Sequence, residues 1–189
     1  MLGLGISLST SGAVSSGLSP SDISGLDLWL KVNTGIVAAS GNTSDAGNMA
    51  DAEDINSWAD QSGNDRHASQ GTASKKPHWE TDSADFGGLV WPDDTADTHM
   101  NLATYVGGDT DNIEANEDFT IMIRVKLTDF STGMGLMGDG SKEVIKWTDN
   151  SRVGIFIGGN TPIRAFEEEG GLTLATDTYY IHTLTRSNG

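Results

Sequence analysis

Acidic side chains dominate the chemistry that this sequence offers. Its 189 residues include 27 Asp and Glu against 11 Lys and Arg, which gives a formal net charge of −16. One predicted loop concentrates carboxylates at Asp93, Asp94 and Asp97. Calcium prefers roughly six to eight oxygen ligands, often from such loops, so these three residues form a candidate calcium site. Clusters of this kind also arise by chance in so acidic a chain, and we expect no other cofactor.

Hydrolytic chemistry requires arrangements that the sequence does not show. A glycosidase holds two carboxylates across the scissile bond, whereas the consecutive Glu167, Glu168 and Glu169 alternate between the two faces of a strand. None of the four histidines lies in a Gly-x-Ser-x-Gly motif or at the helical spacing of a zinc site. The chain has no Cys, which excludes thiol nucleophiles and disulfides. We therefore predict that it is not an enzyme, with a glycoside hydrolase as the less favoured alternative.

Tryptophan side chains are the candidates for carbohydrate binding. Their rings combine a large apolar face with a polar N–H, which suits them to a wet binding surface. The candidate ligand-binding residues are Trp58, Trp79, Trp91 and Trp147. The alternative for each of them is a place in the core or at its rim.

The elements that would position these side chains are predicted to be strands. Apolar residues alternate with polar ones in 26–32 and most clearly in 119–127, where Phe119, Ile121, Ile123, Val125 and Leu127 share the predicted inward face. Further candidate strands are 86–91, 135–137, 143–147, 153–157, 163–166, 172–174 and 179–186. Most of them recur every 8 to 12 residues or so between turn residues, which is typical of an antiparallel sandwich or barrel.

The first 22 residues differ from the rest of the sequence. They are rich in Gly and Ser and carry no charge before Asp22. We predict that 1–22 is an extended arm ahead of a β domain at 23–189, with a flexible tail as the alternative. The residues predicted to make assembly contacts are Leu2, Leu4, Ile6 and Leu8. We expect no secretory signal here, because the segment has neither a basic start nor a long apolar run.

Several motifs follow one another in an order that resembles a known family. They are Leu26-Asp27-Leu28-Trp29-Leu30, Trp58-Ala59-Asp60-Gln61-Ser62-Gly63-Asn64, Pro77-His78-Trp79, Phe119-Thr120-Ile121-Met122 and Thr185-Arg186-Ser187-Asn188-Gly189. This order resembles the concanavalin A-like, laminin-G-like domains over about residues 26 to 189. The resemblance implies an all-β, antiparallel two-sheet jelly-roll sandwich. The family continues beyond the turn at Gly189, so we expect either a longer parent chain or a partner that supplies the last strands.

These observations lead to one function hypothesis and one alternative. The start, Leu2-Gly3-Leu4-Gly5-Ile6, resembles the beginnings of small virion proteins of tailed phages. We predict a non-enzymatic structural protein of the phage particle, either a capsid decoration protein or a tail or fibre attachment module. Its expected partners are other virion proteins and further copies of itself. The alternative is a lectin-like module that binds cell-surface glycans outside the cell.

Charge and hydropathy exclude two other classes of partner. Nucleic-acid affinity depends mainly on Lys and Arg against phosphate, and a net charge of −16 opposes such a contact. A membrane-spanning helix needs about 20 apolar residues in a row, and no run in the sequence approaches that length. We therefore predict neither nucleic-acid binding nor membrane insertion.

Overall fold

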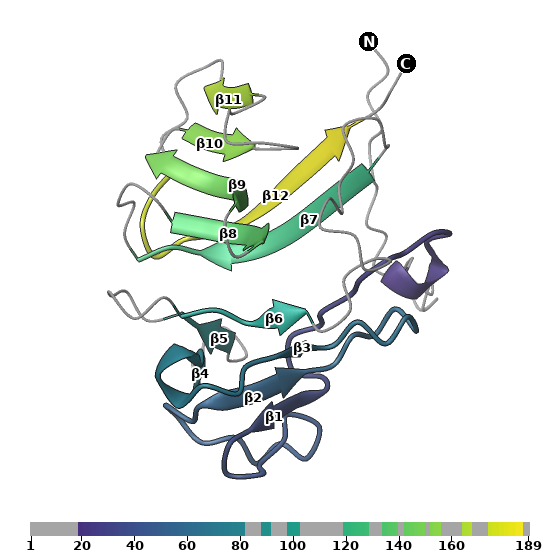
Figure 1. Ribbon diagram of the computed structural model, residues 1–189, viewed down its shortest axis with the longest axis vertical. Coiled ribbons are helices and arrows are strands. Elements are labelled where there is room, and N and C mark those ends of the chain that lie inside the picture. Colours follow the sequence, from purple (N-terminus) through teal and green to yellow (C-terminus); the bar gives the residue numbers. More distant parts are fainter. Residues whose placement is uncertain are drawn as a thin grey trace, which may run out of the picture. The chain divides into compact units, whose positions relative to one another are not determined.

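The computed structural model shows a chain built from antiparallel strands (Figure 1). The structure describes residues 19–81, 88–91, 98–102, 119–128, 134–139, 142–149, 152–155, 164–167 and 174–186. The chain divides into two compact units, Met1–Tyr105 and Val106–Gly189. Within the described residues the only helices are single 3₁₀ turns, so the predicted all-β class is confirmed.

Unit 1 contains short strands joined by long turns. Its elements are η1 (Pro20–Asp22), β1 (Ile36–Ala38), β2 (Ile55–Trp58), β3 (Ala68–Ser69), η2 (Ala73–Lys75), β4 (His78–Glu80), β5 (Gly88–Val90) and β6 (Asn101–Leu102). One sheet has the order β1-β2-β3-β6, and β4 pairs with β5 separately. An isolated bridge between Asp54 and His78 connects β4 to the residue before β2.

A small hydrophobic cluster forms the core of unit 1. Ile36, Ala38, Ile55 and Trp79 are buried in it, and Ile36 and Ile55 are completely covered. Residues packed against this cluster are Met49, Trp58, Leu89 and Met100. The alternating burial of Ile36, Val37 and Ala38 follows from the pleat of β1, which turns successive side chains to opposite faces.

Unit 2 contains longer strands. They are β7 (Phe119–Lys126), β8 (Met134–Asp139), β9 (Lys142–Asp149), β10 (Arg152–Ile155), β11 (Arg164–Glu167) and β12 (Tyr179–Arg186). One sheet has the order β11-β10-β9-β8, and β7 pairs with β12 along its whole length (Figure 1). The strands predicted at 135–137, 143–147 and 179–186 are confirmed, and so are the described residues of those predicted at 153–157 and 163–166.

The predicted alternation in 119–127 is also confirmed. Ile121, Ile123 and Val125 are half-buried, whereas Met122 and Arg124 are exposed. Leu127, the next residue in phase, is buried. The side chain of Phe119 lies outside the described part of the molecule.

The predicted strand at 26–32 is wrong as a regular strand. Its only ladder contact is an isolated bridge between Leu30 and Asp60. Leu26, Leu28 and Leu30 are half-buried as the alternation predicts, but side chains of a later turn bind the backbone of this segment. Residues 1–18 of the predicted arm lie outside the described residues. Its last residues form η1, which Ser19 caps by accepting a hydrogen bond from the backbone N–H of Ser21.

Candidate functional site

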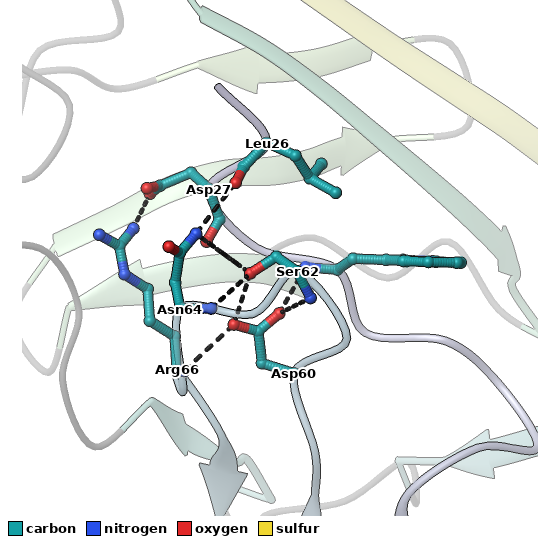
Figure 2. A network of polar contacts seen from close by, with 7 residues as sticks. Leu26, Asp27, Asp60, Ser62, Asn64 and Arg66 are labelled. Carbon is teal, nitrogen blue, oxygen red and sulfur yellow. Dashed lines mark hydrogen bonds and ion pairs between the residues drawn. The ribbon is translucent and has the colours of Figure 1, made fainter. Parts of the chain in front are cut away.

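Among the described residues of unit 1, the densest group of polar contacts surrounds the carboxylate of Asp60 (Figure 2). Its Oδ1 accepts hydrogen bonds from the backbone N–H groups of Trp29 and Ser62, both at 2.9 Å. Its Oδ2 accepts from the Ser62 hydroxyl at 2.7 Å and from the Arg66 N–H at 3.1 Å. Four donors thus converge on a residue that is only 7% exposed. They compensate the loss of water around the charge.

These hydrogen bonds set the protonation state of Asp60. Burial by itself raises the pKa of this carboxyl group, because the charged form loses water. The hydrogen bonds from Trp29, Ser62 and Arg66 together outweigh burial and lower the pKa below its ordinary value. Asp60 is therefore ionised at neutral pH.

The other polar residues of the turn bind the segment before β1. The Asn64 side-chain amide donates to the carbonyls of Leu26 and Asp27 at 2.9 and 3.0 Å. Arg66 forms an ion pair with Asp27. The Gln61 N–H donates to the Trp29 carbonyl at 2.8 Å. We call Asp60, Ser62, Asn64 and Arg66 the turn clamp, since their contacts with 26–29 replace the strand pairing that the alternation predicts.

The turn clamp explains why these residue types occur together. Asp, Ser and Asn side chains readily bond nearby backbone groups, and Gly63 has a φ of 92°, which favours glycine. The motif from Trp58 to Asn64 therefore builds structure. Its polar groups contact the chain itself.

A second carboxylate organises the loop between β1 and β2. Glu53 Oε1 accepts hydrogen bonds from the Ser40 hydroxyl and the Asn42 amide, both at 2.6 Å, and Oε2 accepts from the Ala50 N–H at 2.8 Å. The Ser40 and Ala50 contacts lower the pKa of Glu53. This contact set is again internal to the loop.

The structure describes the surroundings of three of the four candidate tryptophans. Trp79 is 6% exposed and lies in the core, so a sugar ring has no free face there and we withdraw it from the ligand-binding set. Trp58 packs against that core, and its Nε1 donates to the Lys31 carbonyl at 2.9 Å. Trp91, which follows β5, is 46% exposed. The side chain of Trp147 in β9 lies outside the described part.

The remaining predicted site residues fall outside the described ranges. They are the calcium candidates Asp93, Asp94 and Asp97 and the arm residues Leu2, Leu4, Ile6 and Leu8. Among the residues that are described, no group of three or more His, Asp or Glu could hold a metal ion.

Unit 2 carries a surface that the sequence did not identify. Met122 and Ile181 are 65% and 67% exposed on neighbouring strands. The register of β7 and β12 places eight side chains on this side of the sheet. We call them the Met122 face: Thr120, Met122, Arg124, Lys126, Tyr179, Ile181, Thr183 and Thr185. The sequence signal for this face is alternation within each strand: Tyr179 and Ile181 alternate in β12 as Met122 and Arg124 do in β7. The register then places the two sets on the same side of the sheet.

Cations and an aromatic ring lie at one end of the Met122 face. The Arg124 guanidinium is 3.8 Å from the centroid of the Tyr179 ring, and the Lys126 ammonium is 5.1 Å from it. At the other end the Thr120 and Thr185 hydroxyls are 3.3 Å apart, within hydrogen-bond distance. The face therefore combines two exposed apolar side chains, two cations and several hydroxyls, which is a composition suited to binding another molecule.

No helix in the described ranges is long and apolar enough to cross a membrane.

Comparison with known proteins adds no relative. The chain matches no family model, no curated protein and no solved structure.

Proposed function

We propose that this chain is a non-enzymatic structural and attachment module of a tailed-phage particle, where it binds other virion proteins. The observation that carries the proposal is the Met122 face. A large apolar side chain alone on a surface is ordinary, but neighbouring exposed ones with a polar surround are typical of interaction sites. Met122 and Ile181 meet this description, with Thr183 and Thr185 beside them.

The internal use of the turn clamp supports the same role. Asp60 carries the carboxylate with the most donors in the described part of unit 1, and its low pKa suits a permanent anion. A general acid needs a pKa near the working pH. Burial alone would raise the pKa of Asp60 toward that range, but the hydrogen-bond donors around the carboxylate lower it. The clamp holds its own chain together and contributes rigidity to a particle component.

We also propose the finer architecture that the sequence motifs imply. In this proposal the antiparallel sheets belong to a jelly-roll sandwich, and residues 1–22 form an arm that binds neighbouring subunits. Deleting 1–22 should leave the circular dichroism spectrum and the urea midpoint unchanged while preventing incorporation into particles. Unfolding of the truncated chain would mean that these residues belong to the fold.

Particle composition tests the proposed function directly. Peptide mass spectrometry of gradient-purified phage particles should detect the chain at a constant ratio to the main capsid protein. Loss of the chain on purification, together with polysaccharide turnover by the isolated protein, would contradict the proposal.

Glycan binding is the second candidate, and Trp91 favours it. Its ring is 46% exposed and is thus available for stacking on a sugar. A glycan array should then give a signal that Trp91→Ala removes and Trp58→Phe retains. Equal signals from the wild type and Trp91→Ala would exclude this ring as the sugar platform.

A further inference from the structure

We propose that the Met122 face binds the acidic surface around β4 of a second copy of this chain. The inference rests on the proposed assembly function and names a partner for it. It is carried by the charges and spacings of two surfaces, one in each unit.

The Met122 face is basic in a strongly acidic protein. Arg124 and Lys126 are two of its eight residues, and none of the eight is acidic. The whole chain carries 27 acidic and 11 basic side chains. The net charge of a second copy is therefore attractive to this face.

Tyr179 orders the Arg124 guanidinium, which lies over its ring. The Arg124 Cζ is 3.8 Å from the ring centroid, a distance that suits stacking, and a stacked guanidinium keeps at its edge the N–H fork that suits a carboxylate. A side chain that is already ordered loses less conformational entropy on binding. Exposed Met122 and Ile181 add apolar area beside the charges.

The surface around β4 offers carboxylates at a matching spacing. Asp54 lies opposite His78 in an isolated antiparallel bridge, and Glu80 is two residues further along β4. This register sends Asp54 and Glu80 to the same side, roughly 7 Å apart as a diagonal pair. Both residues are exposed. Arg124 and Lys126, two residues apart on β7, are also separated by about 7 Å.

Such a contact joins two different surfaces of identical chains. A head-to-tail interface of this type leaves one free surface at each end, so it builds rings or open arrays. Many weak copies of the contact would then hold the protein in a large assembly.

Charge reversal on each surface provides the experiment. One full-length variant carries Arg124→Glu and Lys126→Glu, and the other carries Asp54→Lys and Glu80→Lys. Sedimentation velocity should show association of the wild type with increasing concentration, and an association constant at least about tenfold lower for each variant alone. An equimolar mixture of the two variants should associate again, because the reversed face of one matches the reversed surface of the other.

The control is Asp65→Lys, which raises the net charge by half as much as the second variant does, at an exposed site outside both proposed surfaces. It should associate at least as well as the wild type. A wild type that stays monomeric, or variants whose mixture does not associate, would overturn this inference. Detection of the chain in purified particles would still support the proposed function in that case, so the two failures are distinguishable.

Discussion

The Asp60 carboxylate accepts a hydrogen bond from the backbone N–H of Trp29, a residue 31 positions earlier, at 2.9 Å. The same oxygen also accepts from the N–H of Ser62. One carboxylate thus joins the segment before β1 to the turn after β2. In a regular strand, pairing with a neighbouring strand satisfies the backbone N–H groups. In the segment 26–29 the Asp60 carboxylate satisfies the N–H of Trp29 instead.

Replacing Asp60 tests the strength of the turn clamp. In Asp60→Asn an NH₂ group replaces one of the two carboxylate oxygens and cannot accept a hydrogen bond. In one orientation of the amide this group faces the backbone N–H groups that Oδ1 binds, and in the other it faces the Ser62 hydroxyl and the Arg66 N–H that Oδ2 binds. We expect a loss of about 2–3 kcal/mol in the free energy of unfolding, measured by urea denaturation. Asp65→Asn is the matched control, since the Asp65 side chain is 92% exposed. Equal stabilities of the two variants would contradict the role of the clamp.

Acid should weaken the same contacts. The pKa of Asp60 is lowered in the folded state from its ordinary value of 3.8, so folding favours the ionised form. Its contribution is fully present above that value and is lost as pH falls through the lower folded-state pKa. Urea midpoints measured from about pH 5 down to about pH 2 should therefore fall more steeply for the wild type than for Asp60→Asn. Parallel curves would show that Asp60 titrates alike in the folded and unfolded chains.

Two glycines with similar backbone angles should respond differently to alanine. Gly35 has a φ of 68°, and a Cβ there would lie 2.6 Å from the Ala59 Cβ. Gly47 has a φ of 64° with nothing within 4 Å of the same position. Gly47→Ala should cost about 1 kcal/mol from the backbone alone, whereas Gly35→Ala should cost about 2–4 kcal/mol. Equal losses in thermal or urea unfolding would place the whole cost in the backbone.

The two faces of β7 should differ in their tolerance of charge. Ile123→Asp places a carboxylate on the half-buried side, next to His182 on β12, and should cost about 2–4 kcal/mol. Met122→Asp, on the neighbouring position that is 65% exposed, should change the free energy of unfolding by about 0.5 kcal/mol or less. A larger loss for Met122→Asp would mean that another part of the chain covers this face.

The comparison of sequence and structure shows where local patterns suffice. Alternation identified β7 because its eight residues are long enough for the period of two to be clear. The same rule failed at 26–32, since an alternating sequence records which side is buried and not what binds the backbone. The side chains that replace the pairing, Asp60 and Asn64, come more than 30 residues later.

Single side chains were harder to predict than strands. Trp79 belongs to a strand of three residues, too short for a pattern that separates a core ring from a binding ring. The Met122 face depends on the pairing of β7 with β12, whose partners Met122 and Thr183 are 61 positions apart in the numbering. Neither strand alone indicates that its apolar and basic residues meet on one exposed surface.

Oxidation of Met122 measures the central claim most directly, namely that the chain assembles through the Met122 face. Met122 is 65% exposed, and an exposed methionine oxidises readily to the sulfoxide, which mass spectrometry quantifies peptide by peptide. Brief peroxide treatment of the free chain and of purified particles should give fast oxidation at Met122 in the free chain and strong protection in the particles. Oxidation of half-buried Met49 should change little between the two samples. Equal rates at Met122 in both samples would show that this face stays uncovered in the assembly and would contradict the account.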